Sequence, residues 1–216
     1  MNGKQYKIII FDFDGTLADT AECIVKTCKT TLEQLRLPLK TDDEIRNVIG
    51  LPLDQCFSTL MPEADDSTIE RCCEVYRSLF FSFQEQTIRL FPKVRETLCS
   101  LHSADIIVAI ATSRGTKSLK ELCQMFNIDE YVGMKMASDL VTEKKPAPEM
   151  VNKILAHYSI NPSDALVVGD TIFDIEMGQR ANCDTCGVTY GNHTRCQIEK
   201  AKPTYIVDEI DEILRF

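Results

Sequence analysis

The 216-residue chain holds 24 lysines and arginines against 33 aspartates and glutamates, a formal net charge of −9, so a broad nucleic-acid footprint is excluded on electrostatic grounds. Hydrophobic residues make up 44% of the chain and charged residues 26%, which is typical of a globular protein rather than a disordered or fibrous one. The longest apolar run, 106–111, spans six residues, whereas a bilayer span needs about 20 and a signal peptide at least ~7. We therefore expect neither a membrane segment nor a secretion signal.

In chain order, the first element is a buried strand over 7–12, and the stretch that follows, 18–88, contains no strand-like run. Its helical segments lie near 20–35, 42–48, 53–60 and 67–84. This helical insert holds 13 acidic and 7 basic residues, a net charge of −6, whereas the remainder holds 20 acidic and 17 basic residues, a net charge of −3. Because the insert leaves after one strand and returns before the next, we expect a separate lobe over the carboxyl end of that strand, where open α/β sheets bind ligands.

The rest of the chain alternates between helical segments and short apolar runs. Helices are predicted at 93–102, 117–126, 149–158 and 172–181, strands at 106–112, 165–170 and 185–190, weaker edge strands at 131–137 and 204–207, and a closing helix over 208–216. Strands that alternate with helices of this length indicate βαβ units. The predicted fold is therefore α/β, a doubly wound parallel sheet with an inserted helical domain.

The ten cysteines are scattered through these apparent helices and strands. We expect reduced, buried thiols and a cytoplasmic location rather than a secreted disulfide framework. The pair Cys183 and Cys186, with His193 and Cys196 nearby, raises a zinc site as an alternative. It is disfavoured because Cys186 falls in a strand-like run and no second pair of closely spaced cysteines completes a tetrahedral set.

Two carboxylates end the first strand. Asp12 and Asp14 are two residues apart in an extended chain, so both side chains lie on one side of it. Gly15 permits a sharp exit from the strand. An acidic turn open to solvent is the alternative, but these acids directly follow four apolar strand residues. The two acids are therefore expected to share one site.

Polar residues emerge at further strand ends in the same way. Thr112, Ser113 and Arg114 follow one buried run, Asp170 follows another with Asp174 four residues later, and Lys145 lies just before a helix. Each has an ordinary alternative: a helix cap, a surface lysine, or a first-turn acid. In a parallel sheet, however, strand ends lie on one edge. We therefore expect a single site to collect these side chains.

These residues resemble the haloacid dehalogenase-like hydrolase superfamily. That superfamily is recognised by four motifs, which occur here in order as Asp12-Phe13-Asp14-Gly15-Thr16, Thr112, Lys145-Pro146-Ala147-Pro148 and Gly169-Asp170-Thr171-Ile172-Phe173-Asp174. The insert resembles the superfamily's helical cap of the first type, and Cys186 to Gly191 resembles a stretch of its phosphoglycolate phosphatase-like members. The resemblance implies a Rossmann-like core over 1–17 and 89–216 and a cap over 18–88.

The resemblance also implies a Mg²⁺-dependent phosphatase that acts through an aspartyl-phosphate. In that scheme Asp12 is the nucleophile and Asp14 the general acid and base, while Asp12, Asp170 and the backbone carbonyl of Asp14 bind the metal. Asp174 supports the metal site or holds Lys145, and Lys145 and Thr112 orient the phosphoryl oxygens. Further substrate contacts are expected from Gly15, Thr16, Ser113, Arg114 and Arg46, the last beside the turn Gly50-Leu51-Pro52-Leu53.

The implied substrate is a small phosphorylated metabolite: phosphoglycolate first, then a nucleotide, a sugar phosphate or pyrophosphate. A β-phosphoglucomutase-like sugar phosphomutase is an alternative function, although such enzymes carry an acidic residue at the position of Gly169. From another class, a phospho-accepting receiver domain also uses an acid pair, a Thr or Ser and a Lys, but receivers are about half this length and lack the insert. We predict no nucleic-acid or membrane partner, and the oligomeric state stays without a prediction.

Overall fold

The computed structural model describes residues 5–216, apart from the side chains of residues 84–87. Its core is a sheet of six strands in the order β5-β4-β1-β6-β7-β8, and every neighbouring pair is parallel. The strands are β1 Ile8–Phe11, β4 Ile107–Ala111, β5 Met134–Met136, β6 Ala165–Gly169, β7 Asp184–Val188 and β8 Tyr205–Val207. The predicted α/β fold is confirmed, and the two weaker strands lie at the two edges of the sheet.

Side chains of β1 alternate between the two faces of the sheet, as the period of a strand requires. Ile8 and Ile10 belong to one buried cluster, whereas Ile9 and Phe11 belong to the other. None of the four is more than 2% exposed. A strand covered on both faces needs apolar residues on both, which explains the unbroken apolar run in the sequence.

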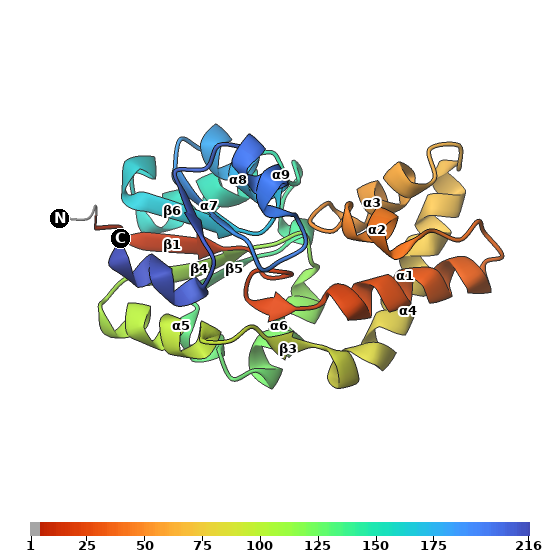
Figure 1. The fold of residues 1–216 in the computed structure, drawn as a ribbon, viewed down its shortest axis with the longest axis horizontal. Coiled ribbons are helices and arrows are strands. Elements are labelled where there is room, and N and C mark those ends of the chain that lie inside the picture. The colour runs from red at the N-terminus through yellow and green to blue at the C-terminus, as the bar shows by residue number, and fades with distance from the viewer. Residues whose placement is uncertain (1–4) are drawn as a thin grey trace.

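Helices cover both faces (Figure 1). Buried residues of α5, α6 and the 3₁₀ helix η4 join the cluster of Phe11, and those of α7 and α8 join the cluster of Ile10 on the opposite face. The bounds are α5 Val94–Ser103, α6 Thr116–Met125, α7 Glu149–Tyr158, α8 Ile172–Arg180, α9 Arg195–Lys200 and η4 Ile210–Arg215, with shorter 3₁₀ turns η1 Asp129–Tyr131, η2 Ser138–Leu140 and η3 Pro162–Asp164.

The insert forms a lobe beside the sheet (Figure 1). Its elements are β2 Ala18–Asp19, α1 Ala21–Gln34, α2 Asp42–Arg46, α3 Leu53–Leu60 and α4 Asp66–Thr87, and strand β3 Arg89–Leu90 follows directly after it. The helices bury a cluster of their own, which includes Leu32, Phe57 and Cys72. Strands β2 and β3 pair antiparallel, so the chain leaves the core and re-enters it at adjacent points.

Two predicted helices differ from the observed ones for local reasons. The helix expected over 42–48 ends at Arg46, because the chain turns at Gly50, whose φ of +101° is a left-handed conformation that favours glycine. The closing helix expected over 208–216 is a 3₁₀ helix. Its buried residues Ile210 and Ile213 are three positions apart, which matches the three-residue turn of that helix.

All ten cysteines are free. Seven are buried and Cys56 is half-buried, but Cys99 and Cys196 are exposed, so the expectation of buried thiols is wrong for these two. Their helices, α5 and α9, turn one side to solvent. Among the helices of the described residues, none combines the length and the apolar composition that crossing a membrane would require.

Candidate active site

A lysine and two acids form a buried charge cluster at the carboxyl edge of the sheet. Lys145 Nζ lies 2.6 Å from Asp12 Oδ1 and 2.6 Å from Asp174 Oδ1. The lysine and Asp174 are fully buried, and the Asp12 side chain is 3% exposed. Burial lowers the pKa of Lys145, but the charges of Asp12 and Asp174 outweigh burial and raise that pKa overall. The lysine therefore stays charged and holds the Asp12 carboxylate in place.

Asp170 lies at the end of β6 and is fully buried. Its Oδ1 accepts a hydrogen bond from Thr16 Oγ1 at 3.0 Å, and its Oδ2 accepts from the backbone N–H of Asn192 at 2.7 Å and from Nδ2 of Asn192 at 2.9 Å. Burial and the charge of Asp174 raise the pKa of Asp170 to about 7, against the effect of these hydrogen bonds. These neighbours therefore hold the Asp170 carboxylate in place, but they do not fully balance its negative charge.

Gly15 makes the approach of Asp170 possible. A Cβ at this position would lie 2.1 Å from Asp170 Oδ2 and 2.2 Å from Asn192 Nδ2, and its φ is +90°. Its N–H donates to the carbonyl of Ala18 at 2.8 Å, which differs from the expectation that this group faces the substrate. The role of Gly15 is therefore to lack a side chain. The segment that follows β1 can then lie against Asp170.

The donor set at this edge fits a divalent cation that takes oxygen ligands. Among the described residues, one oxygen each of Asp12, Asp170 and Asp174 lie within 4.8 Å of one another. Oδ2 of Asp12 is buried and has no hydrogen-bond partner, whereas Asp174 Oδ2 already accepts from the backbone N–H and the hydroxyl of Thr171. Asp12 and Asp170 are therefore the side chains that fit a cation, and Asp174 holds Lys145.

Asp14 faces the cavity with its carboxylate bound to Arg114. Nε of Arg114 donates to Asp14 Oδ2 at 3.1 Å and Nη2 donates to Oδ1. Arg114 also donates to Ser118 Oγ at 2.7 Å, its guanidinium lies 4.5 Å from the ring centroid of Phe80 on α4, and its side chain is 8% exposed. Arg114 was predicted to contact the substrate, but its fork is engaged with Asp14.

Thr112 and the backbone around it provide a cradle of donors. Thr112 lies at the end of β4, is 1% exposed, and its Oγ1 accepts from the N–H of Arg114 at 3.2 Å, so its own proton is available to an acceptor. Within residues 5–216, the N–H groups of Phe13, Asp14 and Ser113 donate to no protein acceptor. Free N–H groups and a hydroxyl suit the oxygens of a phosphoryl group.

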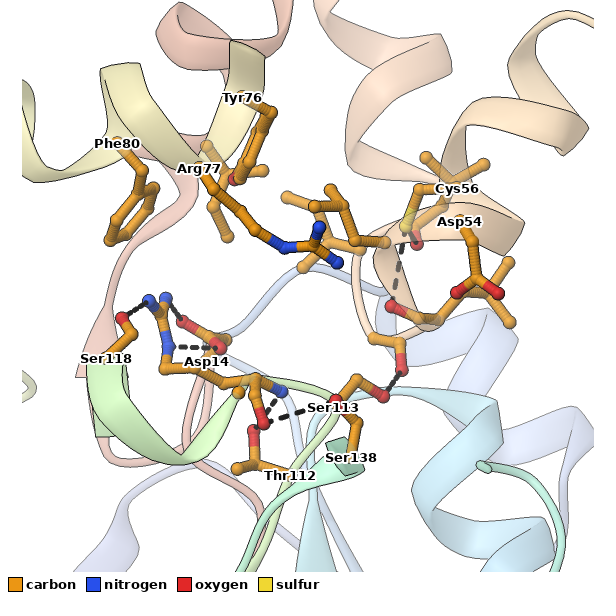
Figure 2. Close-up of a pocket in the computed structure, with 18 of the residues that line it drawn as sticks. Asp14, Asp54, Cys56, Tyr76, Arg77, Phe80, Thr112, Ser113, Ser118 and Ser138 are labelled. Carbon is orange, nitrogen blue, oxygen red and sulfur yellow. Dashed lines mark hydrogen bonds and ion pairs between the residues drawn. The ribbon is translucent and has the colours of Figure 1, made fainter. Parts of the chain in front are cut away.

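The cavity lies between this edge and the insert, with a volume of about 480 Å³. Figure 2 shows its floor, which carries Asp14, Thr112 and Ser113. Ser113 Oγ donates to the carbonyl of Gly50 in the insert at 2.6 Å, so this predicted substrate contact instead joins the core to the insert. Gly50, Leu51 and Leu53 line the cavity. The turn therefore reaches the cavity.

Arg46, by contrast, lines a second hollow of about 270 Å³ with Gly15, Glu22 and Tyr190, and it is absent from the lining of the main cavity. The short helix α2 turns it away, because Ile45 next to it is buried in the insert's own cluster. Arg77 of α4 lines the main cavity and points into it (Figure 2). Sequence reasoning missed it because a charged residue in a long amphipathic helix is typical of a solvated face.

Asn192 and Lys144 were also missed. Asn192 lies in the loop after β7, beside the Gly191 that was noted as part of a family-like stretch, and only the fold brings it to Asp170. Lys144 Nζ lies 2.9 Å from Asp54 Oδ1 of α3. It is thus a second contact between core and insert, formed by the neighbour of Lys145.

Comparison with known proteins agrees with this geometry. The family model described as haloacid dehalogenase-like hydrolase matches residues 9–188. The chain belongs to this family. It is 32% identical over 213 residues to a protein of Dickeya dadantii (strain 3937) named probable phosphatase IndB, with 96% of this chain and 91% of that one covered. It is 27% identical to a phosphoglycolate phosphatase of Vibrio vulnificus (strain YJ016), with 99% and 97% covered.

Solved haloacid dehalogenase-like structures share the whole fold. The crystal structure of a predicted phosphoglycolate phosphatase from Haemophilus somnus 129PT matches with a TM-score of 0.90 and 26% identity, and the match covers 98% of this chain and 97% of that one. The resemblance to this family and to its phosphoglycolate phosphatase-like members is confirmed, and so is the expectation of an enzyme, a phosphatase of this family. A receiver domain is excluded, because the family model covers the core motifs and the insert together.

Proposed function

We propose that the protein hydrolyses a small phosphomonoester through an aspartyl-phosphate on Asp12, with Mg²⁺ as its cofactor. The observation that carries the proposal is the Asp12 carboxylate: Lys145 fixes one oxygen at 2.6 Å, and the other is buried without a partner. An unpartnered oxygen in a buried site is costly unless it meets a ligand. Attack on phosphorus and cation binding are the two uses that fit this position.

In the first half-reaction, the Asp12 carboxylate forms a bond to phosphorus as the bond from phosphorus to the leaving oxygen breaks. The protonated Asp14 carboxyl donates its proton to that oxygen, so the alcohol leaves neutral. In the second, the carboxylate of Asp14 takes a proton from water, which attacks phosphorus and releases phosphate and free Asp12. One residue thus serves both steps.

The other side chains handle charge and orientation. Lys145, the Thr112 hydroxyl and the free N–H groups would meet the phosphoryl oxygens, where negative charge must be balanced. A bound Mg²⁺ would neutralise the repulsion between the carboxylate and the phosphate dianion. Asp12, Asp170 and the backbone carbonyl of Asp14 would hold it, in keeping with the unmet charge on Asp170.

We also propose that 18–88 acts as a cap over a catalytic core of 1–17 and 89–216, in a cytoplasmic setting that ten free cysteines support. Polar contacts between core and insert, among them Ser113 to Gly50 and Lys144 to Asp54, would hold the cap closed and exclude water from the reacting groups. A closed cavity favours a small phosphorylated substrate over a macromolecule.

Hydrolysis is favoured over a sugar phosphomutase reaction by Gly169. Sugar phosphomutases of this kind carry an acid before the fourth-motif aspartate. Here a Cβ at position 169 would lie 2.2 Å from Asp174 Cβ, so a larger side chain would displace the acid that holds Lys145. The site is therefore built around a glycine at this position.

The test is Asp12→Asn, with Asp105→Asn as the matched control. The amide is nearly isosteric but does not attack phosphorus, so we expect Mg²⁺-dependent phosphate release to fall by several orders of magnitude. Asp105 is exposed and has a φ of 56°, a conformation that asparagine adopts readily, so the control should keep full activity.

Wild-type enzyme quenched in acid during turnover should carry one phosphate on Asp12, detectable by mass spectrometry of the peptides. More than a few per cent residual activity in Asp12→Asn would show that the nucleophile is elsewhere.

A further inference from the structure

The cavity has two chemically different halves. The core supplies a polar floor with Asp14 and Thr112, whereas the insert supplies a largely apolar wall. Three aromatic rings of that wall contact one another in series: Phe57 and Tyr76 meet edge to face with centroids 6.0 Å apart, and Tyr76 and Phe80 stack with centroids 5.9 Å apart. Phe57 and Phe80 are 1% and 4% exposed and support Tyr76 from either side, so the half-buried ring of Tyr76 is the one that can pack against a flat apolar group.

Arg77 stands out among the cations that line this cavity. Arg114 is bound to Asp14, Lys144 to Asp54, and Lys117 lies 5.1 Å from the ring centroid of Phe81. Within the described part of the chain, Arg77 has no hydrogen bond, ion pair or ring contact of its own. Figure 2 shows its guanidinium pointing into the cavity, between Tyr76 and the polar floor. It is therefore available to an anionic group of a bound molecule.

The cavity is also larger than the simplest substrates need. Its volume of about 480 Å³ lies within the ~300–1,000 Å³ that is typical of small-molecule pockets. The glycolate of phosphoglycolate, or the second phosphate of pyrophosphate, would fill only a small part of it and would leave the aromatic wall uncovered. Uncovered apolar wall contributes nothing to binding.

From these features we infer that the substrate is a phosphomonoester whose leaving group has a flat apolar body, which packs against Tyr76, and a carboxylate, which binds Arg77. The inference rests on the proposed function, because it takes the phosphoryl group to lie at Asp12. Two parallel N–H donors of a guanidinium match the two oxygens of a carboxylate.

A carboxylate fits better than a second phosphate for an electrostatic reason. Four acids and four bases line the cavity, so the lining has no net formal charge: Asp12, Asp14, Asp54 and Asp139, and Arg77, Arg114, Lys117 and Lys144. Within the described part of the chain Arg77 is the lining base without a partner, and one guanidinium balances the charge of a carboxylate but only part of the charge of a phosphate dianion.

Three alkyl phosphates separate the two parts of the inference. Benzyl phosphate has the flat apolar body alone, 4-carboxybenzyl phosphate has the body and the carboxylate, and phosphoglycolate has the carboxylate alone. All release a primary alcohol, so their demand for protonation by Asp14 is similar. We expect kcat/KM in Mg²⁺ to be highest for 4-carboxybenzyl phosphate, by about tenfold or more over each of the others. The uncharged 4-carbamoylbenzyl phosphate should match benzyl phosphate.

Arg77→Gln tests the carboxylate contact, with Arg71→Gln on the same helix as the matched control. Arg71 is exposed and pairs with Glu74 outside the cavity. In Arg77→Gln, we expect the ratio of kcat/KM between 4-carboxybenzyl and benzyl phosphate to fall by about 10- to 100-fold, mainly through KM. Arg77→Lys should restore part of the ratio, and Arg71→Gln should leave it unchanged.

Either of two results would overturn the inference. One is a wild-type preference for phosphoglycolate or pyrophosphate over both benzyl esters. The other is an Arg77→Gln variant that loses activity on all four esters to the same extent. Hydrolysis of p-nitrophenyl phosphate separates these failures from failure of the proposed function. If the enzyme hydrolyses this ester but lacks the expected preference, only the inference is wrong. If no ester is hydrolysed in a Mg²⁺-dependent way, both the inference and the proposed function are wrong.

Discussion

The bidentate pair with Arg114 fixes Asp14, the residue that moves protons in the mechanism proposed above. Because both guanidinium contacts point at one carboxylate, removal of Arg114 leaves the rotamer of Asp14 undetermined. We expect Arg114→Gln to lower kcat on benzyl phosphate by about 10- to 100-fold, within the range that general acid catalysis contributes. The rate on p-nitrophenyl phosphate, whose leaving phenolate needs little protonation, should fall much less.

Ser118→Ala is the control for this prediction, because it removes the other hydrogen-bond partner of Arg114 and keeps the pair with Asp14. It should keep both rates. Arg114→Lys should behave like Arg114→Gln, since an ammonium cannot reproduce the fork. If both esters slow equally in Arg114→Gln, the arginine acts on the phosphoryl group and not through the acid.

At the same residue scale, the buried Asp170 predicts a pH-dependent metal requirement. Burial disfavours the carboxylate and raises its pKa to about 7, so below that pH a proton competes with the cation, and above it the carboxylate is free to bind. The Mg²⁺ concentration at half-maximal activity should therefore rise as pH falls from 8 to 6, by up to about tenfold per unit below 7.

Direct titration of Mg²⁺ binding by calorimetry at each pH checks this, and the number of protons released per bound cation should rise toward one at low pH. In Asp170→Asn, binding should be weak at every pH and its pH dependence should flatten. A metal requirement that is the same at pH 6 and pH 8 in the wild type would contradict the prediction.

At the scale of elements, Gly178 sets how closely α8 lies on the sheet. A Cβ there would lie 2.5 Å from Thr185 Cγ2 and 2.9 Å from Val167 Cβ, on β7 and β6. Alanine favours a helix over glycine by ~1 kcal/mol, but overpacking of a buried contact costs about 1–3 kcal/mol or more. We expect the clash to prevail, so Gly178→Ala should lower the free energy of unfolding in urea by about 1–2 kcal/mol.

Gly115→Ala is its counterpart, because a Cβ there meets nothing within 4 Å and the residue's φ is −77°. It should change the free energy of unfolding by less than about 0.5 kcal/mol. Because α8 begins with the residues that hold Asp174, Gly178→Ala should also lower activity if the helix shifts. A Gly178→Ala variant as stable as the wild type would show that α8 moves away freely.

At the scale of the whole molecule, the thiols report how tightly the fold closes. Burial raises the pKa of Cys28 to about 12 and that of Cys123 to about 11, so at pH 8 almost none of either is thiolate, the reactive form. Cys99 and Cys196 are exposed, so a thiol reagent can reach them. With a thiol-specific disulfide reagent at pH 8, we expect two fast reactions in the native protein and ten in denaturant. More than three fast thiols would indicate that a cluster opens.

The sequence allowed prediction of the sheet and the catalytic edge, because buried strands and the polar residues that follow them are local patterns. It did not allow prediction of partners chosen by tertiary structure. Arg114 meets an acid 100 positions earlier, Asn192 reaches Asp170 only because β7 lies beside β6, and the direction of Arg77 depends on the rotation of α4 over the cavity. Helical periodicity identifies the face of α4 that packs on other helices. It does not determine which of the remaining residues of α4 face the cavity.

The antiparallel pairing of β2 with β3 brings both connections to the insert to one place, Ala18 beside Leu90 and Asp19 beside Arg89. To the sheet, the four helices between them are therefore a single long loop, and the entropy of closing a loop grows only with the logarithm of its length. Lengthening, shortening or exchange of those helices leaves the positions of Asp12, Thr112, Lys145 and Asp170 nearly unaffected. Evolution can thus change which molecule enters the cavity while the four side chains that we propose act on the phosphate ester stay where they are.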